Sequence, residues 1–309
     1  MKLVENKAEL IQQNNGINGL YDHIKACVYN KNDDSQVSSE DFVKFLIENK
    51  KYNELEFGTV YLAAFIDRHT TTISDATDIY KMANRYQENP YSIVCCTLPE
   101  NDNDTDKFYI TTNYRVLVEN NWLDDLKYLC SPTENHVKRF SFKLTTSIGV
   151  SKHLYKYKRL SLYDYALENP SSVIDKSDNQ VLYCKPSWLK LNLGIYSYNL
   201  VTNLSDAENG FYISGDGYLV PEENDSEENF FLKCCLVTES RYKAILSLGE
   251  VPTQAMEVLP LSTATTVVCT GFLCDLNPLF DLHESTDKDT VNPSMIELVD
   301  KMVKLVNNE

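Results

Sequence analysis

Short segments with a period-two pattern alternate along this chain with longer segments of helical period, and this mixture restricts the fold to the α+β class. β-branched and aromatic residues predict strands at 58–62, 108–112 and 139–144. No internal repeat or long linker divides the 309 residues. We therefore predict one domain over residues 1–309, with a mixed or antiparallel sheet flanked by helices and a helical second half.

The helical pattern is strongest at the C-terminal end of the chain. Asn292 and Pro293 predict the start of a helix, and apolar residues then recur at helical spacing as far as Val306. This apolar stripe predicts a contact with the core or with another subunit. Other helices are predicted up to about residue 28, at 38–47, at 74–87, and from about 229 to a stop at Gly249.

Two acidic, polar segments predict surface loops near 100–106 and 221–228. The run Ser-Gly-Asp-Gly at 214–217 lies between two strand-like segments and predicts a hairpin turn. None of these segments carries a recognisable catalytic group, so we expect them to be structural.

The net charge of −16 narrows the classes of partner. A surface of this charge repels phosphate backbones and anionic headgroups, so neither nucleic acid nor a membrane is expected as a partner. No apolar run reaches the roughly 18 residues that cross a bilayer, and no signal-peptide pattern opens the chain. We expect a cytoplasmic protein of a bacterial cell. The bias towards Asn, Lys, Asp and Tyr indicates an AT-rich genome, such as that of a virus of bacteria.

Cysteine and histidine usage predicts neither a disulfide framework nor a metal site. The nine cysteines are an odd number and include no Cys-x-x-Cys pair, and most lie in apolar stretches where a reduced thiol packs as a small hydrophobe. The five histidines are scattered and form no His-x-x-x-His pair. Phosphate-binding glycine loops and the Gly-x-Ser-x-Gly elbow are also absent from the sequence.

One segment, residues 151–165, is basic and aromatic within an acidic protein. Such a segment suits an anion, although the solvated charged face of a helix explains it equally well. At this segment the chain resembles the flavin-dependent thymidylate synthases. Their signature is Arg-His-Arg-x-x-Ser, then four residues and Ser-x-Arg-Tyr, and the matching stretch here runs from Lys156 through Ser161 to Asn169. Similar blocks occur in the family's order at 5–11, 55–62, 112–119, 126–134, 184–189, 257–261 and 270–272.

The resemblance implies the family's fold, a homotetramer, and an enzyme that uses FAD, a nicotinamide donor and a folate to methylate deoxyuridylate. The cofactors supply the reactivity in such an enzyme, and the protein supplies binding and orientation. Loss of the positioning residues should therefore remove the activity.

At the family's flavin-binding positions this chain keeps part of the charge and loses the geometry. Lys156 and Lys158 replace the two signature arginines, Tyr157 replaces the histidine, and Ser161 is retained. Lys51 stands where the family has another flavin-contacting histidine. Lysine lacks the planar fork with which arginine binds phosphate, so any grip on flavin should be looser.

The family's nucleotide-binding positions are replaced more severely. They are Ala166 for the second signature serine, and Glu168, Met256 and His283 for three arginines. At about 1.5–3 kcal/mol per charged hydrogen bond, loss of three arginines removes roughly 4.5–9 kcal/mol of binding free energy. Glu168 adds repulsion next to a phosphate.

We therefore hypothesise a pseudoenzyme with no intact catalytic residue and no cofactor, which serves as a binding, structural or assembly component and associates with itself as a homotetramer. A divergent active enzyme is the first alternative. It would hold FAD or another anion on Lys156, Tyr157 and Lys158. An acidic inhibitor of an unidentified protein partner is the second alternative.

Overall fold

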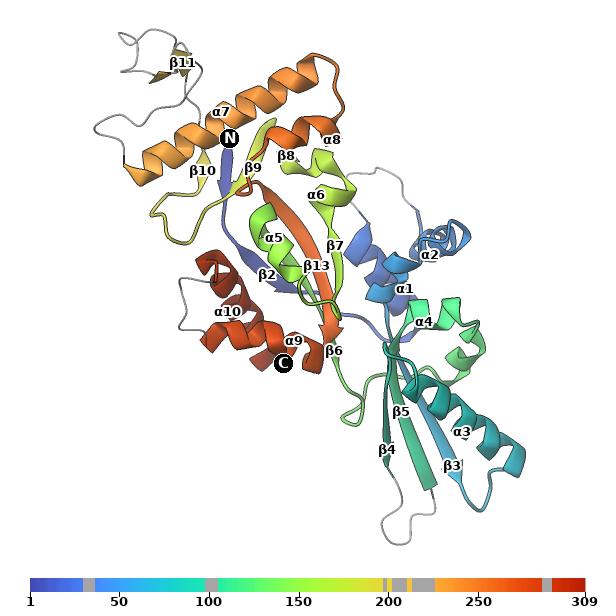
Figure 1. The fold of residues 1–309 in the computed structure, drawn as a ribbon. Coiled ribbons are helices and arrows are strands. Elements are labelled where there is room, and N and C mark those ends of the chain that lie inside the picture. The colour runs from blue at the N-terminus through green and yellow to red at the C-terminus, as the bar shows by residue number, and fades with distance from the viewer. Residues whose placement is uncertain are drawn as a thin grey trace.

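The structure is a computed structural model, and it describes residues 1–29, 37–97, 105–196, 199–201, 210–212, 226–284 and 291–308. Figure 1 shows the order and arrangement of its elements. The turn predicted at 214–217 lies outside the described residues. Of the two predicted acidic loops, Thr105 and Asp106 belong to a strand, and Glu227 and Glu228 begin a helix.

A four-stranded antiparallel sheet forms the centre of the molecule. Its strands, in spatial order, are β2 (Lys7–Leu10), β6 (Arg139–Ser147), β13 (Ala264–Phe272) and β7 (Ser161–Asp164). The predicted period-two pattern of β6 is confirmed, because Phe142 and Leu144 are fully buried on one face while Lys143 and Thr145 are half-buried on the other.

Helices α5 (Ile148–Leu154), α9 (Leu273–Phe280) and α10 (Pro293–Asn307) cover the apolar face of this sheet. The predicted C-terminal helix is confirmed. The side chain of Asn292 accepts a hydrogen bond from the Ser294 backbone N–H, and Met295, Leu298, Val299 and Met302 pack into the core. The apolar stripe is therefore mainly a core contact.

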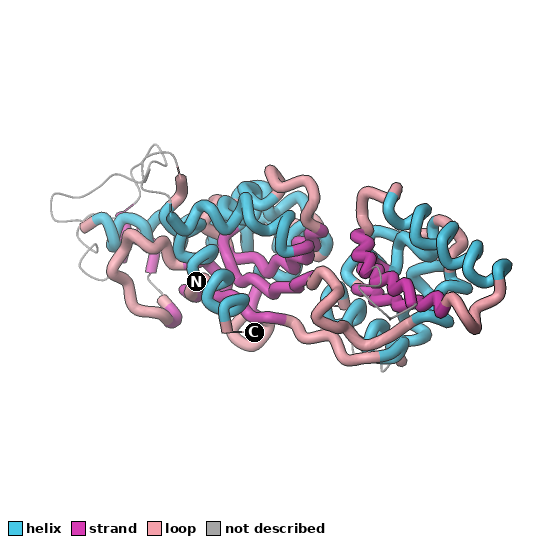
Figure 2. The backbone as a smooth tube through the Cα atoms, turned by 90° about the horizontal axis from the view of Figure 1, so that it is seen from below, coloured by secondary structure: helices cyan, strands magenta, loops and turns pink. Residues whose placement is uncertain are grey.

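A second group of elements surrounds a three-stranded antiparallel sheet. Its strands are β3 (Thr59–Asp67), β5 (Thr105–Asn113) and β4 (Ile93–Thr97). Four helices share its hydrophobic cluster, and they are α1 (Gly16–Val28), α2 (Ser39–Glu48), α3 (Ile73–Gln87) and α4 (Tyr114–Glu119). Figure 2 shows the strands as two groups, each with its own helices. Tyr165 and Val268 of the central group belong to the same cluster, so the two groups are packed against each other.

A mixed sheet continues the central one at its other end. Its order is β10 (Gly194–Ile195), β1 (Lys2–Val4), β9 (Gln180–Cys184) and β8 (Ile174–Asp175), with β1 parallel to β9. Helices α7 (Glu227–Ser247) and α8 (Pro252–Ala255) pack on it. A short parallel pair joins β11 (Asn199–Val201) to β12 (Gly210–Tyr212).

The N-terminal part of the sequence prediction is wrong, since the predicted first helix begins only at Gly16 and the residues before it form β1 and β2. Gly16 has a φ of +79°, a conformation that separates the extended chain from the helix. The second half contains the expected helices, and it also supplies β13, which pairs with both β6 and β7.

The described residues also bear on three sequence expectations, about membrane spans, cysteines and metal ligands. No helix among them is long and apolar enough to cross a membrane. The nine cysteines are free thiols, and Cys96 and Cys274 are exposed, so burial as small hydrophobes applies to only part of the set. No group of three potential metal ligands gathers in the described ranges.

Candidate functional site

Four of the nine positions predicted from the resemblance line one cleft of about 450 Å³, which we call the signature cleft. They are Tyr157, Lys158, Ser161 and Glu168. The opposite wall is the 3₁₀ helix Tyr52–Phe57, which contributes the carboxylates of Glu54 and Glu56. The sequence stretch that resembles the family's signature thus faces a cavity large enough for part of a nucleotide-sized ligand.

The backbone of the signature stretch differs from the helix suggested by its charge pattern. Helix α5 ends at Leu154, a turn follows in which the Leu160 N–H donates to the Tyr157 carbonyl at 3.0 Å, and Ser161 begins β7. Helix α6 (Tyr165–Glu168) then starts with the side chain of Asp164 as its cap. The alternative of one charged helical face is therefore wrong, because the segment spans a turn, a strand and a short helix.

Negative charge dominates the signature cleft. Burial raises the pKa of the Glu54 and Glu56 carboxyls, and the Glu168 carboxylate raises the pKa of Glu54 further. Cations outside the lining offset part of this charge. Glu56 Oε1 lies 3.6 Å from a guanidinium nitrogen of Arg115, Arg139 also lowers the pKa of Glu56, and Lys51 lowers the pKa of Glu54. Lys158 is the lining residue of this cleft that carries a positive charge, and its side chain is exposed. Three carboxylates therefore face one lysine.

The retained serine, Ser161, lines the same cleft as the three carboxylates. Ser161 is buried. Burial raises the pKa of Glu56, and the hydroxyl of Ser161 slightly opposes that rise. Lys51 lies at the start of the 3₁₀ helix, is exposed, and has its ammonium 5.8 Å from the centre of the Phe45 ring. Lys156 is exposed and does not line the cleft. Of the two lysines of the signature, Lys158 therefore lines the cleft and Lys156 does not.

The four nucleotide positions do not all come together within the chain. Ala166 is fully buried, and its N–H donates to Asp164 Oδ1 at 3.0 Å and to Thr265 Oγ1 at 3.2 Å. Met256 is packed in the same hydrophobic cluster as Ala166. His283 lies far along the chain, in the 3₁₀ helix Asp281–Glu284 that follows α9, and its Nδ1 lies 2.5 Å from Asp300 Oδ1 of α10. Only Glu168 reaches the signature cleft.

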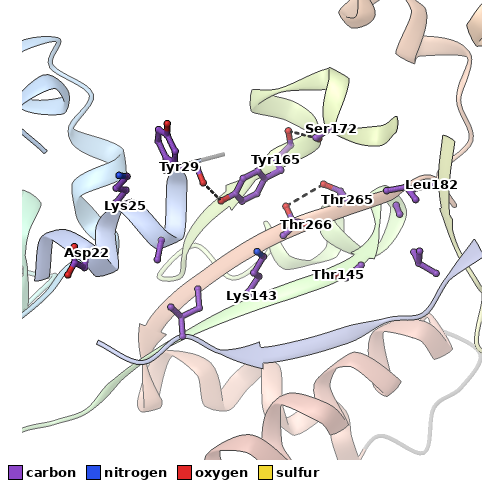
Figure 3. A pocket seen from close by; sticks show the side chains of 14 residues that line it. Asp22, Lys25, Tyr29, Lys143, Thr145, Tyr165, Ser172, Leu182, Thr265 and Thr266 are labelled. Atoms are coloured by element: carbon purple, nitrogen blue, oxygen red, sulfur yellow. Dashed lines mark hydrogen bonds between the residues drawn. The ribbon is translucent and has the colours of Figure 1, made fainter. Parts of the chain in front are cut away.

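A second, larger cavity of about 690 Å³ lies between α1 and the polar face of the central sheet, and we call it the sheet–helix cavity. Figure 3 shows Lys143 rising from β6 towards Tyr165 and Thr266, with Lys25 and Tyr29 of the α1 region at the side. No motif in the sequence predicted this cavity. The signal was the period-two pattern of β6, which places Lys143 and Thr145 on the face opposite Phe142 and Leu144.

An aromatic row separates the two cavities. Phe57 and Tyr163 line the signature cleft, and their ring centres lie 6.3 Å apart. Tyr163 meets Tyr165 at 5.1 Å, and Tyr165 lines the sheet–helix cavity. The Tyr165 hydroxyl donates to the Cys27 carbonyl at 3.0 Å, which fixes this wall to α1.

Comparison with known proteins gives weak structural similarity and no match in sequence. No protein-family model matches the sequence, and no curated protein matches it. Two structures of the UMP/dUMP methylase PolB from Streptomyces cacaoi, with 5-Br UMP and 5-Br dUMP, are similar to the whole chain. The first is 10% identical, is covered to 92% and gives a TM-score of 0.40, and the second is 11% identical, is covered to 93% and gives 0.39.

A third similar structure is thymidylate synthase X (ThyX) from Helicobacter pylori with FAD and dUMP. It is 17% identical over 54% of this chain and 66% of that chain, with a TM-score of 0.32.

Proposed function

We propose that this chain is a homologue of the flavin-dependent thymidylate synthases that has lost catalysis and serves as a binding or structural component. One observation carries the proposal: the signature cleft presents the carboxylates of Glu54, Glu56 and Glu168 and the single ammonium of Lys158. A cleft that binds flavin or a nucleotide must stabilise phosphate charge. Here the side chains present would repel it.

The residues of the signature cleft do not fit FAD. Its pyrophosphate carries two negative charges, and a carboxylate about 6 Å from one such charge costs about 3 kcal/mol at an effective dielectric of about 20. The exposed Lys158 ammonium is a point charge without a bidentate fork.

An assay of the family's reaction tests the loss of catalysis. Purified chain is incubated with FAD, NADPH, methylenetetrahydrofolate and deoxyuridylate, and both exchange of the uracil C5 proton and formation of thymidylate are measured. We expect neither. Sustained turnover of either kind would contradict the proposal.

The divergent-enzyme alternative has one observation in its favour, since Tyr157 and Lys158 line the same cleft and could form a rebuilt anion site. It predicts that Lys158→Ala abolishes nucleotide binding. The proposal instead predicts no saturable binding of deoxyuridylate to the wild-type chain, to Lys156→Ala or to Lys158→Ala, because no productive site is present to lose. Lys152→Ala, on the exposed side of α5, is the matched control. Calorimetric titration with deoxyuridylate distinguishes the two outcomes.

The homotetramer and the partner belong to the proposal as well. Static light scattering tests self-association, with a mass of four chains as the expected result. If the acidic surface instead binds a basic partner protein, that complex should dissociate steeply with added salt, because exposed charges more than about 10 Å apart are screened at about 0.1 M.

A further inference from the structure

The sheet–helix cavity has chemistry that the signature cleft lacks. We propose that it binds a small organic anion, with the anionic group held by Lys143 and neighbouring threonines and with an apolar or aromatic body against the cavity walls. This inference does not depend on the proposed loss of catalysis, since the cavity lies on the other side of the aromatic row formed by Phe57, Tyr163 and Tyr165.

Lys143 places a cation inside the cavity. Its cross-strand neighbour on β2 is Glu9, whose carboxylate is paired with Lys7. Lys143 is half-buried on β6, its side chain points into the cavity in Figure 3, and within the described part of the chain no carboxylate or hydrogen-bond acceptor pairs with it. The net charge of the whole chain is −16, so positive charge inside a cavity stands against an acidic background. An unpaired charge of this kind is costly unless a ligand or solvent neutralises it.

The second lysine of the cavity reinforces the positive charge. Lys25 donates to the backbone carbonyl of Val37 and lies 4.9 Å from the centre of the Tyr29 ring, and neither partner is an anion. The carboxylate of Asp22 also lines the cavity and accepts a hydrogen bond from the Ser39 hydroxyl. Among the described residues that line the cavity, two ammonium groups outnumber one carboxylate.

Hydroxyl groups stand beside Lys143 in a defined register. Thr145 lies two residues after Lys143 on the same face of β6. Thr266 of β13 is the direct cross-strand partner of Thr145. The hydroxyls of both threonines line the cavity and have no hydrogen-bond partner among the described residues, whereas Thr265 is bonded to Asp164. Lys143, Thr145 and Thr266 therefore place one cation and two hydroxyl-bearing side chains on the same face of neighbouring strands, a set of groups that suits a carboxylate or a phosphate.

The remaining walls suit an apolar body. Ile11, Ala26, Leu182 and Ala264 line the cavity together with the rings at its side. A volume of about 690 Å³ lies within the usual range for small-molecule sites, which are mostly apolar with a few placed polar groups. The expected ligand is thus an amphiphilic anion. A bare inorganic ion would leave the apolar walls without a partner.

Three probes with the same ring test the proposal on the full chain. Phenyl phosphate, benzoate and benzyl alcohol carry two, one and no negative charges near neutral pH, and each is measured by displacement of the fluorescent anion 8-anilinonaphthalene-1-sulfonate. We expect both anions to bind at least tenfold more tightly than the alcohol, and the order of the two anions identifies the headgroup. Equal affinity for all three probes would overturn the proposal.

Two variants locate the binding. Lys143→Met keeps the aliphatic stem and should weaken the anions about tenfold or more while leaving benzyl alcohol unchanged. Ala26→Phe places a ring at the wall of the cavity and should weaken binding of all three probes, which keeps the test informative if Lys143→Met fails to fold. Lys152→Met, on the exposed side of α5, is the matched control. Wild-type affinity for the anions in both cavity variants would place the binding elsewhere and refute the assignment.

Discussion

Phe142→Ala is expected to lower the free energy of unfolding by about 3–5 kcal/mol, the usual range when a large aromatic side chain is removed from a core. Phe142 is fully buried in the centre of β6 and lies opposite Cys269 on one neighbouring strand and Leu10 on the other. Its ring stacks on Phe140 and meets Phe280 of α9 edge-on, each at 6.4 Å between ring centres. Removing it opens a void between the sheet and the helices.

Urea denaturation followed by circular dichroism measures this loss. The matched control is Phe65→Ala, because Phe65 also lies on a strand but is 50% exposed, and we expect it to cost less than about 1 kcal/mol. Similar losses for the two variants would mean that the central sheet does not pack as described.

Acidification is expected to remove about 3 kcal/mol of stability through His23 alone. His23 is buried between α1 and β6, where Nε2 lies 3.0 Å from the Ser141 hydroxyl, and burial lowers its pKa from 6.5 to about 4, with Arg139 nearby adding to the effect. The folded chain keeps this imidazole neutral, while the unfolded chain protonates it below pH 6.5. Stability is therefore complete above pH 6.5 and is lost as the pH falls towards 4.

The pH range from 7 to 5 should show about 2 kcal/mol of this loss in urea titrations. His23→Gln keeps an amide near the same partners and does not titrate, so its stability should fall less over the same range. Burial also lowers the pKa of His136, which contributes in the same direction and leaves some pH dependence in the variant. An unchanged pH profile in His23→Gln would contradict a neutral, buried His23.

The fold was predictable where local chemistry and periodicity agree. Ser38 caps α2 through the Asp41 N–H, and Asn292 caps α10, as their sequence patterns indicate. The strands β1 and β2 were missed because their pairing partners, β9 and β6, lie more than a hundred residues away. A short segment whose strand conformation depends on such distant pairing carries little local signal.

The candidate site was predictable in the part that is contiguous in sequence. Tyr157, Lys158, Ser161 and Glu168 lie close together along the chain, and the structure places them around one cleft. The decisive charge of that cleft comes also from Glu54 and Glu56, which precede the signature by about a hundred residues, so no local pattern joins them to it. The roles assigned to these positions from the family resemblance stay predictions.

Direct binding of FAD tests the central claim of a degenerate family site. The full chain is purified, its visible absorbance is recorded, and it is then titrated with FAD at low ionic strength, with and without deoxyuridylate. The inverted charge of the signature cleft predicts a colourless protein and no saturable binding. A stoichiometric yellow complex whose flavin is lost in Lys158→Ala would contradict it.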